Sequence, residues 1–328
     1  MTTLLIMLAA VVLNVVLSAA CLQLGARWVG SQRATFGRAI GATLAITAIG
    51  VLAQLAALLF ADASVLAYSL LTLSLVGIAW LLSWEIIRQF FQFSLGRSVL
   101  AWLTSQIATV VMVLFVMFVL VPFVSQGFRT PTNSMAPTIL GDHYLGTCPQ
   151  CGGDAIVSAT DFKNARGEET EFRGICTRCL QIGTTAVSAE MHEGDRFMVD
   201  KLASPRRWDI VAFLSPERPS QTFIHRLVGL PGETVFIRDG QVWINGAAAE
   251  LPAHLNGLRY VTEIPDFGEI SQGTESDPIQ LGDDEYCVLG DFSERASDSR
   301  FWGVVPGENM VGVATVIYWP PRRWTVWR

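Results

Sequence analysis

Ser134 is the residue whose surroundings first suggest chemistry. It stands in the segment R-T-P-T-N-S-M-A-P-T, residues 129–138, which follows a long apolar run and contains Pro131 and Pro137. Proline fixes its own φ angle and biases the residue before it toward extended backbone, so this segment should be stiff. A serine held just outside a membrane is well placed to attack a peptide that is leaving the membrane. Taken alone, the segment fits an ordinary turn after a transmembrane helix better than a nucleophile.

Two later segments place polar residues between apolar runs. Residues 223–235 read F-I-H-R-L-V-G-L-P-G-E-T-V, so a predicted strand with His225 leads into a tight Gly-Leu-Pro-Gly turn. Residues 289–303 read L-G-D-F-S-E-R-A-S-D-S-R-F-W-G and contain Asp291 and Asp298. Imidazole and carboxylate groups are the usual partners of a serine nucleophile, so these segments carry candidate catalytic residues.

Four cysteines between these segments have the spacing of a metal site. Cys148, Cys151, Cys176 and Cys179 form a C-x2-C, 24-residue, C-x2-C pattern. This spacing predicts a zinc ribbon, in which four thiolates hold a structural zinc ion tetrahedrally. In an oxidising compartment the same cysteines could instead form disulfides. A thiol-disulfide catalyst is a weaker interpretation, because no thioredoxin-like βαβ pattern surrounds C-P-Q-C. We predict structural zinc here and no cofactor for catalysis.

Composition and charge divide the chain in two. The 328 residues are 51% hydrophobic and only 16% charged, which is too apolar for one average soluble domain. Residues 1–124 carry five arginines and two acidic residues, a net charge of +3. The remainder carries 18 basic and 27 acidic residues, a net charge of −9. The acidic second part argues against nucleic acid as a partner, and the first part has the composition of a membrane region.

The first part contains four apolar runs, each long enough to span a bilayer. Their loops differ in charge: the first and third loops hold arginine, and the second holds only Asp62. The positive-inside rule therefore places the first and third loops in the cytoplasm and everything after Val124 outside. A signal peptide is the alternative for the first run, but that run lacks a basic start, so we predict a helix. The four runs are Leu4–Leu24, Ala39–Ala61, Val65–Ile87 and Val99–Val124.

In the second part of the chain, apolar and polar residues alternate with a period of two, which predicts β-strands. Residues 234–246 read T-V-F-I-R-D-G-Q-V-W-I-N-G, a hairpin with turns at Asp239-Gly240 and Asn245-Gly246. No helical run of comparable strength accompanies the strands, so we expect a mainly β domain. The other predicted strands are 196–201, 209–214, 223–228, 286–289 and 311–318.

Four ordered blocks of this second part resemble the type I signal peptidases. S-M-A-P-T at 134–138 is similar to the family's nucleophile block, and G-D-R-F-M-V-D-K at 194–201 to the strand block after it. H-R-L-V-G-L-P-G-E at 225–233 is similar to the block that bears the base, and G-D-F-S-E-R-A-S-D-S-R at 290–300 to the block that closes the site. The resemblance implies a membrane-anchored serine endopeptidase with the signal-peptidase β fold. Such an enzyme removes N-terminal signal peptides from exported proteins after small residues.

The departures from the family pattern concern the base. Bacterial members usually carry a lysine where this chain has His225, and a serine that steadies it where this chain has Ala296. The endoplasmic-reticulum branch of the family relies on a serine–histidine pair with an acid, so the resemblance implies His225 as general base for Ser134. A solvent-exposed histidine side chain has a pKa of about 6.5 and is largely a free base at neutral pH. Phe292 stands where the family usually has asparagine, and nothing in the sequence explains it.

Three further roles follow from the resemblance. An imidazole base needs an acceptor on its other nitrogen, and Asp298 or Asp291 could supply it, with Asp298 slightly favoured. Thr132 stands where the family places an oxyanion-stabilising hydroxyl beside the N–H of Ser134, although it could be only a turn residue. Lys201 is the rival base, which we interpret as an ordinary strand-end lysine.

The sequence thus predicts three parts. These are a membrane region at 1–124 with about four transmembrane helices, a catalytic domain at 125–142 and 192–328, and a zinc-ribbon-like insertion at 143–191. The expected location is the inner cell membrane, multi-pass, with the catalytic domain on the extracytoplasmic face. The expected partners are signal peptides of secreted preproteins and the lipid bilayer, with the protein translocation machinery as a further candidate. The alternatives are a catalytically inactive membrane scaffold that binds partners through the ribbon, and a membrane thiol oxidoreductase.

Overall fold

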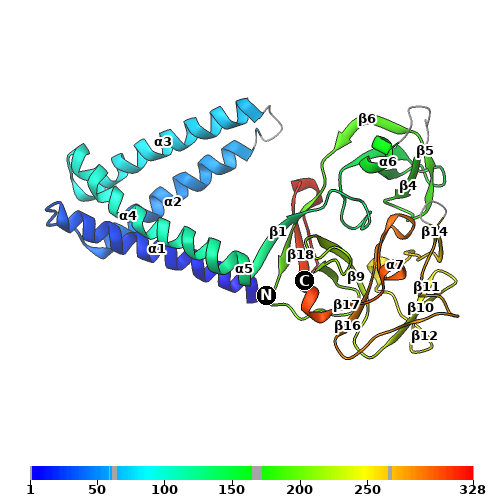
Figure 1. Ribbon diagram of the computed structural model, residues 1–328. Helices are drawn as coiled ribbons and strands as arrows, with labels where there is room; N and C mark the ends of the chain where they lie inside the picture. Colours follow the sequence, from blue (N-terminus) through cyan, green and yellow to red (C-terminus); the bar gives the residue numbers. More distant parts are fainter. Residues whose placement is uncertain (1, 59, 61–64, 165–171, 265–267, 328) are drawn as a thin grey trace. The chain divides into compact units, whose positions relative to one another are not determined.

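The chain folds into two compact units, Met1–Pro122 and Phe123–Arg328. The computed structural model describes residues 2–58, 60, 65–164, 172–264 and 268–327 (Figure 1). The first unit is helical and the second is mostly β, as the change of sequence period predicts.

Four long helices make up the first unit, and among the described residues four are long and apolar enough to cross a membrane. Each contains most of one predicted apolar run. The end of the second run at Ala61 and the loop residue Asp62 lie outside the described residues. The helices are α1 (Thr2–Trp28), α2 (Phe36–Leu58), α3 (Val65–Phe91) and α4 (Leu95–Phe115), and α4 continues through the π-helical η1 (Val116–Leu120) and α5 (Val121–Phe123).

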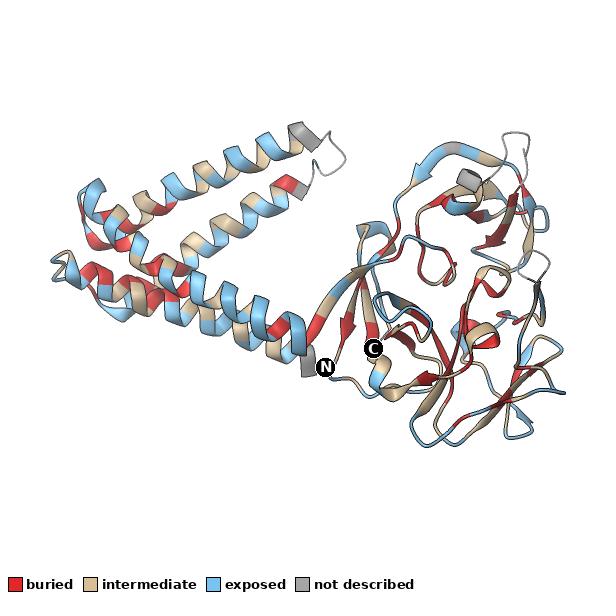
Figure 2. Cartoon of the chain, viewed as in Figure 1, coloured by how far each residue is buried: buried red, intermediate tan, exposed pale blue. Residues whose placement is uncertain are grey.

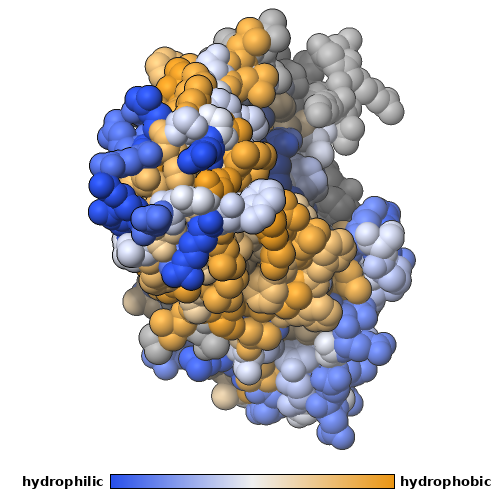
Figure 3. Space-filling view, turned by 90° about the vertical axis from the view of Figure 1, so that its left-hand side faces the viewer, coloured by the Kyte–Doolittle hydropathy of each residue, from blue (hydrophilic) through white to orange (hydrophobic). Residues whose placement is uncertain are grey.

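Small residues line the contacts between these helices. Ala19, Ala26, Ala42 and Ala101 are fully buried there, because alanine lets helix backbones approach closely. Leu22 and Ile87 are buried with them, whereas many other large apolar side chains point outward, as at Leu73, which is 70% exposed. Figure 2 shows exposed residues along the outer faces of the helices, and Figure 3 shows a broad hydrophobic area on the face that it presents. A surface of this kind is suited to lipid rather than to water.

An antiparallel eight-stranded sheet forms the frame of the second unit, with strand order β1-β7-β18-β8-β9-β16-β17 and β19 beside β18. Five of its strands, β7, β8, β9, β16 and β18, match predicted strands to within one or two residues, whereas β1, β17 and β19 were not predicted as strands. The eight strands are β1 (Ser125–Arg129), β7 (Arg196–Asp200), β8 (Ile210–Leu214), β9 (Thr222–Gly229), β16 (Glu285–Leu289), β17 (Val305–Pro306), β18 (Met310–Trp319) and β19 (Thr325–Val326).

The predicted hairpin is present as β10 (Thr234–Arg238) and β11 (Gln241–Ile244). Its turn residue Asp239 has φ of 53° and Gly240 has φ of 78°, the left-handed pair that a tight two-residue turn requires. A second turn of this kind leads from β11 into β12 (Ala247–Ala248). The hairpin belongs to a four-stranded sheet of order β12-β11-β10-β15, where β15 is Ile279–Gln280, and β13 (Glu263–Ile264) pairs with β14 (Gly268–Glu269).

The segment that contains the four cysteines has a five-stranded sheet of its own, of order β5-β4-β3-β2-β6. The chain enters this sheet and leaves it at neighbouring points, because His143 at the start of β2 pairs with His192 at the end of β6. Its elements are β2 (His143–Thr147), β3 (Asp154–Ser158), α6 (Ala159–Asn164), β4 (Phe172–Cys176), β5 (Ile182–Thr185) and β6 (Val187–His192).

Candidate active site

Ser134 lies in a turn that follows β1, and its neighbours anchor that turn in the core of the main sheet. Met135 and Ile139 are fully buried among the side chains of β7, β8, β9 and β18. The amide of Asn133 bridges the turn, with its oxygen accepting from the Gly141 N–H at 2.9 Å and its nitrogen donating to the Asp142 carbonyl at 2.7 Å. Ser134 itself is half-buried, so its hydroxyl is positioned but accessible.

His225 lies on β9, opposite Val211 of β8, and is only 2% exposed. Its ring packs against Phe213 with ring centroids 5.7 Å apart. Neither ring nitrogen has a hydrogen-bond partner among the described residues. Burial lowers the pKa of His225 to about 4, an effect that the negative charge of Asp298 opposes only in part. The imidazole is therefore neutral at physiological pH, and a lone pair is available on one nitrogen.

Ser134 and His225 line one cavity of about 540 Å³. Gly290 lies close to both residues. A Cβ atom at this position would lie 2.7 Å from the Ser134 carbonyl oxygen, 3.2 Å from His225 Cδ2 and 2.2 Å from the Ala296 Cβ. Only glycine allows the closing segment to lie this near to both residues. Thr132 lines the same cavity.

Both candidate acids are paired with arginines. Asp291 accepts from Arg226 Nε at 2.7 Å and Nη2 at 2.5 Å, and also from the Thr138 hydroxyl. Asp298 accepts from Arg300 Nε at 2.8 Å and Nη2 at 2.7 Å, and from the Gly290 N–H at 3.0 Å.

These pairs occupy the oxygens that were expected to orient the imidazole. Among the described residues, neither Asp291 nor Asp298 makes a hydrogen bond to His225. The acids contribute to the site through their charge, since both raise the pKa of His225 against the effect of burial.

Comparison with known proteins identifies the family. The family described as signal peptidase, peptidase S26, matches residues 171–319, which include His225, Asp291 and Asp298. The chain is 39% identical over 163 residues to signal peptidase I of Leptolyngbya laminosa, covering 46% of this chain and 73% of that protein. The chain belongs to the signal peptidase I family.

Two further relatives agree with this placement. A probable signal peptidase I-2 of Synechocystis sp. is 30% identical over 161 residues, covering 46% of this chain and 67% of that protein. Thylakoidal processing peptidase 1 of Arabidopsis thaliana is 30% identical over 166 residues, covering 46% of this chain and 45% of that protein. By class, this member of the signal peptidase I family is a hydrolase.

Lys201, the rival base in this signal peptidase, lies elsewhere. It follows the end of β7, and its backbone N–H donates to the Val124 carbonyl at 3.0 Å. Lys201 is absent from the described residues that line the cavity of Ser134 and His225.

Some residues of the site were not singled out from the sequence. Arg218 lines the cavity from the β8–β9 connection, which is irregular in sequence, and Arg295 and Ser297 line it from the closing segment. The sequence did contain a signal for Arg226, the partner of Asp291, because Arg226 directly follows His225 in a predicted strand. Successive side chains of a strand point to opposite faces, so Arg226 should lie on the face of β9 opposite His225. An arginine that is only 2% exposed requires an acidic partner there.

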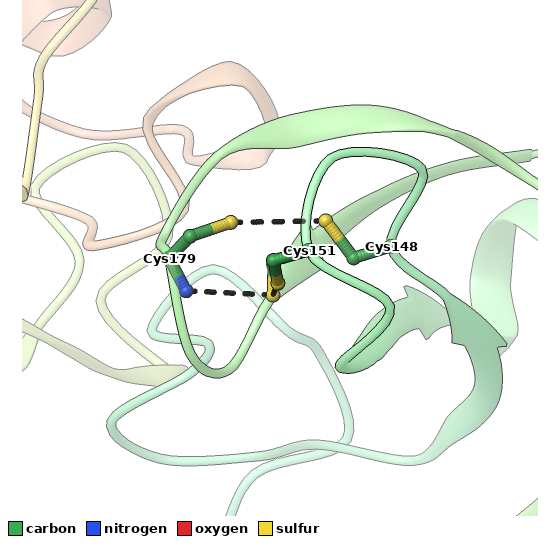
Figure 4. A group of neighbouring side chains, drawn as sticks. Cys148, Cys151 and Cys179 are labelled. Atoms are coloured by element: carbon green, nitrogen blue, oxygen red, sulfur yellow. Dashed lines mark hydrogen bonds between the residues drawn. The ribbon is translucent and has the colours of Figure 1, made fainter.

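The four cysteines of this signal peptidase converge, with all four sulfur atoms within 4.8 Å of one another. Figure 4 labels Cys148, Cys151 and Cys179 and shows the sulfur atoms of Cys148 and Cys179 facing each other. The Sγ atoms of Cys148 and Cys179 are 3.7 Å apart, and those of Cys151 and Cys176 are 3.4 Å apart. The N–H groups of Arg178 and Cys179 donate to Cys176 Sγ at 3.3 and 3.5 Å. A thiolate accepts such hydrogen bonds, and the arrangement fits a group of four metal ligands.

Proposed function

We propose that this chain cleaves signal peptides from preproteins with Ser134 as the nucleophile and His225 as the general base. The observation that carries the proposal is the shared cavity, in which a half-buried serine lies beside a buried imidazole with no hydrogen-bond partner among the described residues. Buried polar groups are nearly always hydrogen-bonded, so an exception in a cavity points to function.

The chemistry follows from the state of the imidazole. Because burial lowers the pKa of His225 to about 4, its neutral form can take the Ser134 proton as the hydroxyl oxygen attacks the peptide carbonyl. The proton then passes to the leaving amine, and water repeats the sequence to release the acyl group. The imidazolium that forms on the way is stabilised by the charges of Asp298 and Asp291, which the charge of Arg300 partly offsets, rather than by a hydrogen bond to either aspartate.

The oxyanion of the tetrahedral intermediate also needs donors. The Ser134 N–H and the hydroxyl of Thr132, both at the cavity, are the pair that we assign to it. Substrate reaches them along β1, the edge strand of the main sheet, whose residue Phe128 also lines the cavity. An extended peptide that adds to this edge would place alternate side chains toward the cavity, consistent with cleavage after small residues.

The proposed setting is the inner cell membrane. The described helices are long enough to span it, and Arg27, Arg33 and Arg38 in one loop with Arg88 and Arg97 in another favour a cytoplasmic side for both loops. The unit from Phe123 onward would then face the extracytoplasmic side, where it meets preproteins delivered by the translocation machinery.

We further propose that Cys148, Cys151, Cys176 and Cys179 hold a structural zinc ion within an insertion at residues 143–191. Zinc–sulfur bonds of about 2.3 Å place tetrahedral ligands roughly 3.8 Å apart, which is close to the sulfur separations of 3.4 and 3.7 Å. A disulfide would need sulfur atoms about 2.05 Å apart. Zinc and thiol analysis of the purified protein tests this: one zinc per chain is expected, whereas no zinc and no free thiols would contradict it.

Cleavage of a purified preprotein by the full chain in detergent tests the catalytic assignment. Ser134→Ala and His225→Ala should each abolish cleavage, because either change removes half of the reacting pair. Lys201→Ala is the matched control and should retain most of the activity. Loss of activity only in Lys201→Ala would overturn the assignment of the base. Cysteine-dependent reductase activity would favour the thiol oxidoreductase, and the absence of serine-dependent cleavage would favour the inactive scaffold.

A further inference from the structure

Phe292 joins three segments that are far apart in the sequence. Its side chain is fully buried in one cluster with Ala136 and Leu140, which follow Ser134, and with Ile156 and Ile175 of the cysteine-containing insertion. The backbone N–H of Phe292 donates to the Ser134 carbonyl oxygen at 3.0 Å. One residue therefore contacts the insertion with its side chain and the candidate nucleophile with its backbone.

Two ion pairs connect the insertion to the same closing segment. Arg173 of β4 pairs with Glu294, with Nε 2.8 Å from Oε2. Asp161 of α6 pairs with Arg295, which lines the cavity together with Ser134 and His225. The insertion thus reaches the wall of the active-site cavity at Arg295 and reaches the serine turn through Phe292.

The cysteine cluster is positioned to fix the surface that covers Phe292. Cys176 ends β4 directly after Ile175, and Ile175 pairs across the sheet with Ile156 of β3. A domain as small as this insertion buries too little apolar surface to be stable alone and usually needs a metal or disulfide constraint. Loss of that constraint would loosen β3 and β4 first, and both strands contact Phe292.

We propose that the four-cysteine insertion is a positioning element of the peptidase site and that Phe292 is the residue through which it acts. The proposal rests on the assignment of Ser134 as nucleophile. With the insertion folded, Phe292 is buried in one cluster with Ile156 and Ile175 of the insertion and with Ala136 and Leu140 of the serine turn. The Phe292 N–H then holds the Ser134 carbonyl, and with it the direction of the serine side chain.

Steady-state cleavage by Phe292→Ala tests the positioning role. We expect kcat to fall roughly 10- to 100-fold, because a shift of about 1 Å at a reacting group has an effect of this size. KM should stay within roughly twofold, since Phe292 does not line the described cavity. Phe292→Leu should restore most of kcat by filling the same space. Val242→Ala is the control, because Val242 is also buried, at 3% exposure, but belongs to the separate hairpin cluster.

A second pair of variants separates positioning from a general loss of stability. Ile175→Ala alters only the insertion side of the cluster and should lower kcat in the same way. Combined with Phe292→Ala it should add little further loss, because residues that act through one contact are not additive. All rates are to be measured well below the unfolding temperature of each variant, with the folded fraction determined by limited proteolysis.

The outcomes distinguish the two proposals. If Ser134→Ala retains cleavage, the assigned nucleophile is wrong. If Ser134→Ala is inactive but folded Phe292→Ala keeps the kcat of Val242→Ala, the positioning role is wrong. Fully additive losses in the double variant would also overturn it, because the insertion would then act by another route.

Discussion

Three titratable side chains near the candidate site are almost fully buried, but they differ in their hydrogen-bond partners. They are the two acids Asp291 and Asp298 and the imidazole of His225. Each aspartate is at most 1% exposed and receives two hydrogen bonds from one guanidinium group. His225 is 2% exposed, and neither of its ring nitrogens has a hydrogen-bond partner among the described residues. The fold thus satisfies its buried charges and leaves its buried imidazole unbonded.

The paired acids and the unbonded imidazole have different roles in the fold. The pair Arg226–Asp291 fixes β9 to the closing segment, and Asp298 binds Arg300 and the Gly290 N–H within that segment. An unbonded buried polar group costs about 1–3 kcal/mol of stability, so its presence requires a reason. On the proposed mechanism, the unbonded imidazole keeps a nitrogen free to take the proton of Ser134.

The largest expected effect comes from breaking one buried pair. Arg300→Met leaves the Asp298 charge without a guanidinium partner, which should lower the free energy of unfolding by about 3–5 kcal/mol. For a unit of this size that is a fall of roughly 6–20 °C in the unfolding midpoint. The unfolding midpoint is measured by heating the protein in detergent and monitoring unfolding of the β unit by limited proteolysis.

Arg196→Met is the control for this comparison. The pair of Arg196 with Glu193 is 3.6 Å long and its side chains are 46% and 60% exposed, so its loss should cost less than about 1 kcal/mol. Equal shifts in the two variants would show that burial does not distinguish these pairs.

Acid provides the next largest effect, because it forces a charge onto His225. The pKa of His225 is lowered by burial to about 4, from an ordinary value of about 6.5. The unfolded chain therefore takes up this proton first as the pH falls. The stability contributed by the neutral imidazole is complete above pH 6.5 and is lost between pH 6.5 and 4, on the order of 3 kcal/mol.

Cleavage should follow the same titration. We expect kcat/KM to be flat from pH 7 to pH 5 and to fall below that with an apparent pKa of about 4. A pH–rate profile measures it, and the acid loss of stability should be smaller in His225→Gln. A decline of kcat/KM centred near pH 6.5 would show that the imidazole of the active enzyme is hydrated or hydrogen-bonded.

An apolar residue in place of His225 tests directly whether the unbonded imidazole costs stability. His225→Leu removes two unbonded nitrogens from a buried position, so it should raise the free energy of unfolding by about 1–2 kcal/mol at pH 7 while cleavage is lost. The unfolding midpoint and the cleavage rate of the same preparation check this. A lower midpoint would mean that His225 has a hydrogen-bonding role in the fold.

The frame of the molecule could be predicted from the sequence because its signals are local. The apolar runs gave the four long helices, and Asp239-Gly240 gave the hairpin turn, since each depends on neighbouring residues alone. The candidate site could also be predicted from the sequence, because Ser134 and His225 stand in blocks of recognisable residue types.

The pairing of side chains could not be predicted in the same way. The partners Arg226 and Asp291 are 65 residues apart, and Arg173 and Glu294 are 121 residues apart. The hydrogen bond expected between an aspartate and His225 was an interpretation from residue types, whereas the oxygens are occupied by arginines that only the folded chain brings near. Phe292 had no explanation in the sequence, because the side chains that cover it belong to the insertion.

The smallest expected effect concerns a second group that the fold leaves unpaired. Three arginines and no acidic residue line the cavity; Arg129 pairs with Asp142 and Arg295 with Asp161, whereas no ion pair to Arg218 is present among the described residues. An exposed cation beside the reacting groups should favour preproteins with an acidic residue near the cleavage site. For such a preprotein, Arg218→Gln should raise KM by roughly two- to fivefold without changing kcat, the size of an exposed ion pair. The difference should disappear at high salt or when the acidic residue is replaced by its amide, and a KM effect that persists in both cases would show that Arg218 acts by shape rather than by charge.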